Sequence, residues 1–186
     1  MYKDIISKLK NDLSNKRFEH SVRVAKMAEE LAARYGVDTK KAYLAGLLHD
    51  CAREHTEAEL LKYVSQNKLK VKEYELRYPV LLHSEVSAAL AKKDFNIMDE
   101  EVLDAIRRHT AGGREMSALS KVLFVADFIE AGRKGEMTQI VRTLAQESLD
   151  RAVLEKAKFM LEFSKRIKEK LHPDVLGTVE YYKNAR

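Results

Sequence analysis

Apolar residues recur every three or four positions along most of this chain, which is the spacing of helices that bury one face. The pattern is clearest over about residues 149–171. Its apolar positions there are Leu149, Val153, Ala157, Met160, Phe163 and Ile167. No segment alternates apolar and polar residues convincingly enough to predict a strand. The pattern therefore predicts an all-α protein.

Residues that commonly begin or end helices divide this pattern into segments. Thr56 and Glu59 have the spacing of a capping box, and Pro79 is tolerated only in the first turn of a helix. Thr138 is expected to begin a further helix. These signals predict helices over about 15–35, 40–52, 57–66, 72–77, 80–93, 100–110, 118–131, 139–146, 149–171 and 175–182. We expect one domain, 1–186, built as a bundle of roughly eight to ten helices.

Composition supports this interpretation. Only 7 glycines and 2 prolines occur in 186 residues, so the composition argues against sandwiches, barrels and disorder. No apolar stretch approaches the roughly 20 residues that span a bilayer, so no membrane helix is expected. The first residues lack the apolar segment of a secretory signal, and Cys51 is a single cysteine. We therefore expect a cytoplasmic protein.

The balance of charges favours anionic partners. The chain has 34 Lys and Arg against 29 Asp and Glu, a formal net charge of +5. Such a charge attracts nucleotides and nucleic acids alike. However, the basic residues are interleaved with acids, and neither a basic arm nor an aromatic platform is present, so specific nucleic-acid binding is not expected. Apolar residues in the C-terminal half could support a homodimer.

Histidines and aspartates occupy unusual positions. Five of the six histidines lie inside or at the ends of predicted helices, beside apolar residues. A lone histidine in this setting is more often a packed core residue, but the number here needs another explanation. Asp127 follows the apolar run VLFVA, where an ionised carboxylate needs a cation or a hydrogen-bonding partner. The residues in such settings are His20, His49, Asp50, His83, His109 and Asp127.

Four histidines and two aspartates gathered in one core require a positive charge where they meet, so we predict a buried divalent metal. Imidazole ligands with a bridging carboxylate favour iron, manganese, zinc or nickel over magnesium, which prefers oxygen ligands. The residues do not choose among these four metals. Cys51 is expected to pack in the core and not to bind the metal. The residues alone thus support metal-dependent hydrolysis of phosphoesters or phosphoanhydrides.

The order of these residues resembles a known signature. His20, His49-Asp50 and Asp127 are arranged as in the HD-domain metal-dependent phosphohydrolases. Longer segments resemble the YqeK-type symmetrical diadenosine-tetraphosphate hydrolases of bacteria. The segments are KRFEHSVRVAKMAEELAARYGVDTKKAYLAGLLHDCA, LLHSEVSAALA, AIRRHTAGGREMSALSKVLFVADFIEAGR and LHPDVLGTVEYYKN. The HTxG segment with the following MS, together with ADFIExGR, is more specific than the His-Asp dipeptide.

The resemblance implies a set of site residues. It implies an iron-type metal held by His20, His49, Asp50 and Asp127. Asp50 would bridge to a second ion held by His83 and His109. Alternatively, one ion is held tightly and these two histidines contact phosphate oxygens, and the sequence does not decide between the two arrangements. In either case Asp50, His83 and His109 are the expected catalytic residues.

Further residues are expected to bind the substrate, together with His20, His83 and His109. Arg17, Arg53 and Arg133 would surround the polyphosphate, because guanidinium groups pair with phosphate oxygens. Thr110 would offer a hydroxyl group to a phosphate. His172 matches a family position near the bound nucleotide.

The chain departs from the family pattern at three positions. Arg53 replaces a lysine and keeps the positive charge, whereas Ser84 replaces a glycine and Ala131 a proline. The last two replacements put loop shape and affinity in question more than the chemistry.

The resemblance implies hydrolysis of diadenosine tetraphosphate into two ADP molecules by attack of water on a phosphorus. One alternative is an HD-domain nucleotidase or a (deoxy)nucleoside triphosphate phosphohydrolase. A further alternative is a nucleotide-binding regulatory HD module. Loss of a ligand residue would favour that last reading, and all six candidate ligands are present.

Overall fold

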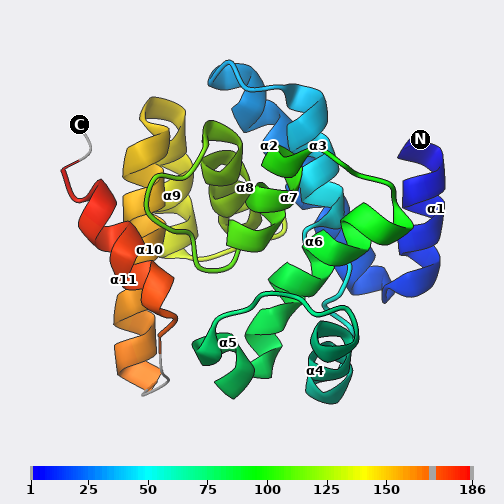
Figure 1. Ribbon diagram of the computed structural model, residues 1–186. Helices are drawn as coiled ribbons and strands as arrows, with labels where there is room; N and C mark the ends of the chain where they lie inside the picture. Colours follow the sequence, from blue (N-terminus) through cyan, green and yellow to red (C-terminus); the bar gives the residue numbers. More distant parts are fainter. Residues whose placement is uncertain (1, 168–170, 185–186) are drawn as a thin grey trace.

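The computed structural model describes residues 2–167 and 171–184, and it confirms the all-α prediction. Within these residues lie eleven α-helices and one 3₁₀-helix, η1, and no strand (Figure 1). The helices are α1 Tyr2–Asp12, α2 Asn15–Arg34, α3 Thr39–Leu48, α4 Glu57–Gln66, α5 Glu73–Arg77, η1 Pro79–Leu82, α6 His83–Asp94, α7 Glu100–Arg108, α8 Ala118–Ile129, α9 Glu136–Glu147, α10 Leu149–Ile167 and α11 Pro173–Tyr182.

One helix, α1, was not predicted. Ile5, Leu9 and Leu13 recur at four-residue spacing and are buried, so the same periodic signal was present before position 15. The capping box is confirmed, since Thr56 and Glu59 satisfy each other's backbone N–H groups at the start of α4. The apolar periodicity of the sequence therefore already indicated α1.

Several predicted boundaries were wrong. The helix predicted to reach residue 52 ends at Leu48, and tight turns follow in which the Cys51 N–H bonds to the Leu48 carbonyl. Helix α9 begins at Glu136, with Thr138 buried inside it and not at its start. Tight turns and short 3₁₀ pieces at helix ends have no strong sequence signature, which explains these errors.

The C-terminal predictions also need correction. Helix α10 ends at Ile167, whereas residues 168–170 of the predicted segment lie outside the described residues. Helix α11 begins at Pro173, earlier than predicted, because proline is favoured in the first turn of a helix.

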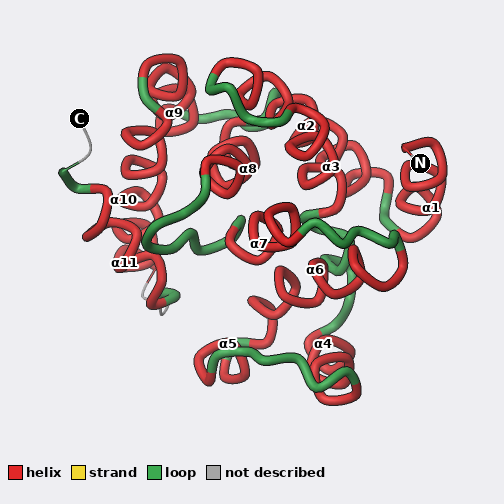
Figure 2. Tube along the Cα trace, turned by 45° about the horizontal axis from the view of Figure 1, so that its top comes forward, coloured by secondary structure: helices red, strands yellow, loops and turns green. Residues whose placement is uncertain are grey.

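Helix α8 is the central element of the fold. It packs against α2, α3, α7, α9 and α10, and Figure 2 shows it surrounded by other helices. The run Val122–Ala126 is fully buried, so α8 is apolar almost all round. Asp127 is the next residue, and its position on a central helix carries its carboxylate to the interior.

Helices α2 and α3 approach each other very closely. A Cβ atom at Gly46 would lie 2.5 Å from the Ala25 Cα and 2.8 Å from the Ala25 N. Only glycine fits this crossing. The close contact brings the helix that carries His20 against the helix that ends beside His49.

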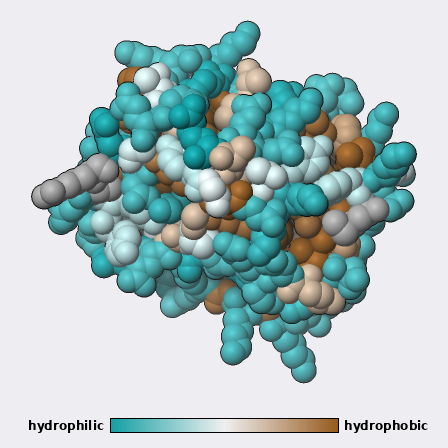
Figure 3. All heavy atoms as spheres, turned by 90° about the horizontal axis from the view of Figure 1, so that it is seen from above, coloured by the Kyte–Doolittle hydropathy of each residue, from teal (hydrophilic) through white to brown (hydrophobic). Residues whose placement is uncertain are grey.

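The outer surface is largely hydrophilic. In the view of Figure 3, polar side chains cover most of the face, and apolar residues appear in separated patches. Among the described residues, none of the helices has the length and apolar character needed to cross a membrane.

Candidate metal centre

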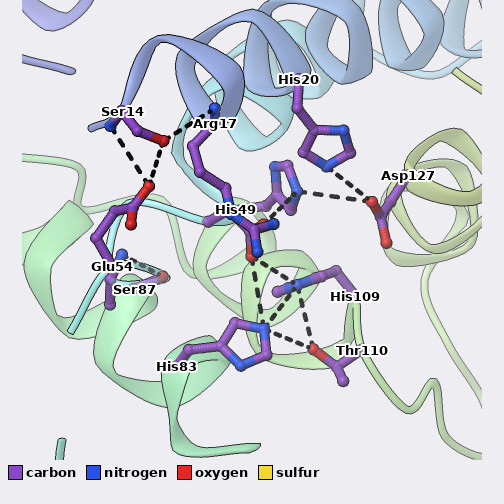
Figure 4. A network of polar contacts seen from close by, with 12 residues as sticks. Ser14, Arg17, His20, His49, Glu54, His83, Ser87, His109, Thr110 and Asp127 are labelled. Carbon is purple, nitrogen blue, oxygen red and sulfur yellow. Dashed lines mark hydrogen bonds and ion pairs between the residues drawn. The ribbon is translucent and has the colours of Figure 1, made fainter. Parts of the chain in front are cut away.

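Five segments bring the six predicted ligands together in one cluster (Figure 4). His20 comes from α2, His49 and Asp50 from the end of α3, and His83 from the start of α6. His109 follows α7, and Asp127 lies on α8. Potential ligand atoms form two groups, each within 4.8 Å, and the groups share Asp50. One group contains His20, His49 and Asp50, and the other contains Asp50, His83 and His109.

The turn that carries Asp50 is anchored on two sides. The Ser14 hydroxyl, at the start of α2, donates to the Glu54 carboxylate at 2.6 Å. The Ala52 N–H donates to the Ser87 hydroxyl on α6 at 3.0 Å. These bonds tie the segment after α3 to its neighbours and hold Asp50 between the two groups of histidines.

Three of the histidines share one hydrogen-bond pattern. In each, the ring Nδ1 contacts the backbone carbonyl of the residue three positions earlier. The pairs are His49 with Gly46 at 2.8 Å, His83 with Val80 at 2.7 Å and His109 with Ile106 at 2.7 Å. A carbonyl only accepts, so Nδ1 carries the proton and Nε2 presents its lone pair to the cluster. Backbone carbonyls orient metal-binding histidines in the same way.

His20 is oriented by a carboxylate. Its Nδ1 lies 3.3 Å from Glu130 Oε1, and its Nε2 lies 3.1 Å from Asp127 Oδ1. Glu130 is buried and accepts from the Arg23 Nε–H at 2.6 Å. Burial acts to raise the pKa of Glu130, but the bonds from Arg23, the Gly132 N–H and His20 outweigh it and lower the pKa.

Glu130 was not among the predicted site residues. The sequence held a partial signal, since a second acid follows the same apolar run three residues after Asp127. A glutamate at the end of a helix normally faces solvent. Here the backbone leaves the helical conformation at Glu130, and its side chain reaches α2.

Two buried nitrogen atoms have no hydrogen-bond partner among the described residues: Nε2 of His20 and Nε2 of His49. The His49 Nε2 lies 3.8 Å from Asp127 Oδ1 and 3.7 Å from Asp50 Oδ2. Because the Nδ1 proton of His49 is held by a carbonyl, its Nε2 lone pair faces carboxylate oxygens and is repelled by them unless a cation lies between. This set of donors therefore fits a divalent metal ion. We call His20, His49, Asp50 and Asp127 the carboxylate side of the cluster.

The other group is arranged differently. Nε2 of His83 and Nε2 of His109 lie 3.3 Å apart, and the Thr110 Oγ1 lies 3.2 and 3.1 Å from them. The same two nitrogens lie 3.5 and 3.6 Å from Asp50 Oδ1. We call His83, His109 and Thr110 the imidazole side. Asp50 is the link between the two sides.

Burial controls the protonation of the cluster. It lowers the pKa of His49 to about 4 and, with the nearby His109 and Arg53, that of His83 to about 3. For Asp127, burial acts to raise the pKa, but His20 and Lys156 outweigh it and hold the pKa well below its usual value. At neutral pH His49 and His83 are therefore neutral and Asp127 is ionised, which are the forms that bind metals. For His20, burial acts to lower the pKa, but Asp127 and Glu130 outweigh it and raise the pKa.

Two of the three predicted arginines reach the cluster. Arg17 Nη1 lies 3.5 Å from Asp50 Oδ2, and Arg133 Nη2 lies 3.4 Å from Asp127 Oδ1. Their side chains are 37% and 49% exposed, so both stand where the site meets solvent. Arg53 is half-buried and lies near enough to lower the pKa of His83.

His172 lies outside the metal cluster, at the start of α11, with its Nε2 3.6 Å from Glu75 Oε1. It lines two neighbouring pockets, as does Thr110. One pocket is polar, has a volume of about 250 Å³ and includes Glu75, Glu85, Asp104 and Arg107. The other is apolar, has a volume of about 210 Å³ and includes Phe159, Met160 and Phe163. Thr110 joins both pockets to the imidazole side.

Lys156 is a second residue that the sequence interpretation missed. It is buried on α10, and its Nζ lies 4.0 Å from Asp127 Oδ2. Its signal was present, because it stands seven residues after Leu149 and therefore on the apolar face of that helix.

A cluster of histidines and aspartates with open Nε2 positions, held in a helical bundle, defines the class of protein. Residues 17–132 match the family model of the HD domain. The chain therefore belongs to the HD-domain family. The matched segment includes all six residues of the cluster and ends before α9.

Curated relatives cover nearly the whole chain. It is 34% identical over 173 residues to the symmetrical bis(5'-nucleosyl)-tetraphosphatase of Bacillus subtilis, covering 93% of this chain and 92% of the relative. It is 36% identical over 181 residues to the protein of that name from Staphylococcus aureus, covering 93% and 90%. A crystal structure from Clostridium acetobutylicum superimposes with a TM-score of 0.96 at 34% identity, covering 100% of this chain and 98% of that one. That structure is described as a predicted HD superfamily hydrolase involved in NAD metabolism.

Proposed function

We propose that this protein is a metal-dependent hydrolase that cleaves diadenosine tetraphosphate symmetrically into two molecules of ADP. The observation that carries the hydrolase assignment is the buried, unpartnered Nε2 atom of His49, which faces Asp50 and Asp127. The substrate follows from the relatives, which are named symmetrical bis(5'-nucleosyl)-tetraphosphatases over nearly the whole length of this chain.

The donors suit two ions that share Asp50. His20, His49, Asp50 and Asp127 would hold the first, and Asp50, His83 and His109 the second. We favour this arrangement over direct phosphate contacts by His83 and His109. Their Nδ1 protons are engaged by backbone carbonyls, so their Nε2 atoms present lone pairs, which suit a metal ion better than a phosphate oxygen.

Iron is the metal we propose, as the sequence resemblance implied, with manganese, zinc and nickel as alternatives. All four suit sites rich in imidazole. When bound, a divalent ion of this kind lowers the pKa of a coordinated water and polarises phosphoryl oxygens.

The residues of the chain would bind and orient the polyphosphate. Arg17 and Arg133 stand at the solvent edge of the cluster and would neutralise charge on the non-bridging oxygens. Arg53 would add a third charge, and the Thr110 hydroxyl would contact a phosphate beside the imidazole side. The apolar pocket with Phe159 and Phe163 would take an adenine ring, and His172 would line the path to it.

Cleavage requires attack of water on one of the two central phosphorus atoms. The bond from that phosphorus to the central bridging oxygen breaks, and the bridging oxygen leaves on the second ADP. A phosphate group has a second pKa of about 6, so this leaving group needs little help from a general acid. The absence of a free N–H on His83 and His109 is therefore compatible with the reaction.

The test is product analysis with purified protein loaded with iron or manganese, using diadenosine tetraphosphate, ATP and a dinucleotide with only two bridging phosphates. We expect ADP as the only product from the tetraphosphate and slow or no cleavage of the other two. Asp50→Ala should lose both bound metal and hydrolysis. Release of ATP and AMP, or faster cleavage of ATP, would show that this is a different HD-domain phosphohydrolase.

Two further predictions concern the state of the protein in the cell. We propose a cytoplasmic location, which fractionation of the source cells would test. We also propose a homodimer that uses exposed apolar residues of the C-terminal half outside the apolar pocket, such as Leu176 and Tyr181. Light scattering coupled to gel filtration would measure its mass, and a monomer at micromolar concentration would contradict it.

A further inference from the structure

Lys156 is a buried lysine that bonds to two backbone carbonyls and lies beside a carboxylate. Its side chain is 4% exposed. The Nζ donates to the Phe124 carbonyl at 2.5 Å and to the His109 carbonyl at 3.4 Å. It also lies 4.0 Å from Asp127 Oδ2. The ammonium group thus makes two hydrogen bonds to backbone carbonyls and one ion pair with a carboxylate.

The carboxylate of Asp127 is held from two directions. Its Oδ1 faces the cluster, 3.1 Å from the His20 Nε2 and 3.8 Å from the His49 Nε2. Its Oδ2 lies 4.0 Å from the Nζ of Lys156, and the half-exposed Arg133 lies 3.4 Å from Oδ1. The lysine therefore fixes which oxygen points towards the histidines.

The same ammonium group joins the two sides of the cluster. Phe124 and Asp127 lie on α8, whereas His109 follows α7 on the imidazole side. Because the Nζ contacts all three, it links the spacing of Asp127 to that of the His109 backbone. The lysine itself lies on α10, outside the segment 17–132 that matches the HD domain.

Stabilisation of the fold does not explain a buried charge at Lys156. Burying an ammonium group costs free energy, and well-packed apolar residues often replace buried ion pairs without loss of stability. Lys156 also lies over the Phe124 ring, at 3.7 Å from its centroid, so an apolar side chain would fit the same space. A role in orienting the ligands explains the charge better.

We propose that Lys156 is a positioning residue of the metal centre. It acts through Asp127, by directing Oδ1 towards the ion held with His20 and His49, and through the backbone of His109. This inference rests on the proposed function only in so far as Asp127 is a metal ligand. It does not depend on which phosphoanhydride is cleaved.

The first experiment compares two substitutions on α10. Lys156→Met removes the charge but keeps the length, whereas Lys158→Met is the same change at an exposed side chain that pairs with Glu155. Binding of Mn²⁺ alone is measured by equilibrium dialysis of the metal-free protein. We expect Lys156→Met to weaken the tighter site by about 10–100-fold. Lys158→Met should bind Mn²⁺ as the wild type does.

A double-mutant cycle separates orientation from packing. If Lys156 acts through Asp127, Lys156→Met should weaken Mn²⁺ binding much less in an Asp127→Asn background than alone. The cycle also covers a failure to fold. Lys156→Met removes the buried cation beside Asp127 Oδ2 and leaves that carboxylate only the half-exposed Arg133, so the double variant should unfold at a higher temperature than Lys156→Met alone.

Two outcomes would overturn the inference. One is Mn²⁺ binding by Lys156→Met that matches Lys158→Met. The other is an effect of Lys156→Met on the tighter Mn²⁺ site that is equal with Asp or Asn at position 127, since Lys156 would then not act on that site through Asp127. Failure of the proposed function would give a different set of results. In that case the wild type binds Mn²⁺ and the cycle shows coupling, but diadenosine tetraphosphate is not cleaved.

Discussion

The two sides of the metal cluster use similar residues in different electrical settings. On the carboxylate side, the Nε2 atoms of His20 and His49 have no hydrogen-bond partner among the described residues and face two aspartates. On the imidazole side, the Nε2 atoms of His83 and His109 contact each other and the Thr110 hydroxyl, and one oxygen of Asp50 is the nearby carboxylate. The first side concentrates negative charge, and the second is nearly neutral.

The comparison shows how one cluster could hold two ions with different strength. A divalent ion gains most where ionised carboxylates are already fixed by surrounding groups. Glu130 and Lys156 supply this support on the carboxylate side, whereas backbone carbonyls orient the rings of the imidazole side. We therefore expect tight binding on the carboxylate side and weaker, exchangeable binding on the imidazole side.

The largest expected effect comes from removing one histidine from each side. His49→Gln should leave almost no metal after dialysis and lower kcat by about 10³-fold or more, because it removes a ligand of the tighter site. His83→Gln should keep one ion per chain and lower kcat less. Elemental analysis after dialysis, paired with hydrolysis rates, checks both. If His83→Gln loses all metal while His49→Gln retains it, the two sides have been assigned the wrong way round.

The six candidate ligands could be singled out because each stands out locally. Asp127 interrupts an apolar run, and His20 shares the apolar face of its helix. The residues that support them could not be found this way, because their roles depend on contacts across long stretches of chain. Glu130 contacts a residue 110 positions earlier, and Lys156 contacts the backbone 47 positions earlier.

The fold also has features that local sequence predicts and features that depend on distant contacts. Long helices with periodic apolar positions were predicted, whereas the turn after α3 was assigned to a helix. That turn is stabilised by bonds from Ser14 and to Ser87, which lie on other elements. Local preference therefore predicted the helices, and tertiary contacts decided where they end. The end of α3 matters because Asp50 lies there.

A second prediction concerns the support of the carboxylate side. Glu130→Gln should weaken the tighter Mn²⁺ site by about 10–100-fold, because a neutral amide orients and polarises the His20 ring less well. Glu19→Gln is the matched control, since Glu19 also pairs with Arg23 but is exposed. Equilibrium dialysis of the two variants makes the comparison. Equal binding by both would mean that His20 needs no carboxylate behind it.

A third prediction tests whether the crossing of α2 and α3 sets the carboxylate side. Gly46→Ala would force a Cβ against the Ala25 backbone, so we expect a loss of about 1–3 kcal/mol in unfolding free energy. Weaker Mn²⁺ binding should accompany it.

Gly177→Ala on α11 is the control for this substitution. Its new Cβ would meet only Arg114 side-chain atoms, at 3.5 Å or more, and alanine favours a helix by up to about 1 kcal/mol. Urea unfolding of the metal-free proteins measures both. Equal stability of the two variants would show that α2 and α3 can separate without cost.

The smallest expected effect concerns Glu85, on α6 beside the imidazole side. Burial, with the nearby Glu75, raises the pKa of Glu85 to about 7, although Arg107 at 3.5 Å opposes the shift. The unfolded chain ionises this group at about pH 4.3, so rising pH favours the unfolded state until Glu85 also ionises in the folded protein.

The metal-free wild type should therefore lose about 1–2 kcal/mol of unfolding free energy between pH 5 and pH 8 that Glu85→Gln does not lose. Urea unfolding at the two pH values measures this difference, with the exposed Glu30→Gln as control. If Glu85→Gln loses as much unfolding free energy between the two pH values as the wild type does, the pocket beside the imidazole side is more hydrated than its side chains indicate. If the difference appears, an acidic group in that pocket opposes folding at neutral pH. The imidazole side would then carry an electrostatic cost that the paired charges of the carboxylate side avoid.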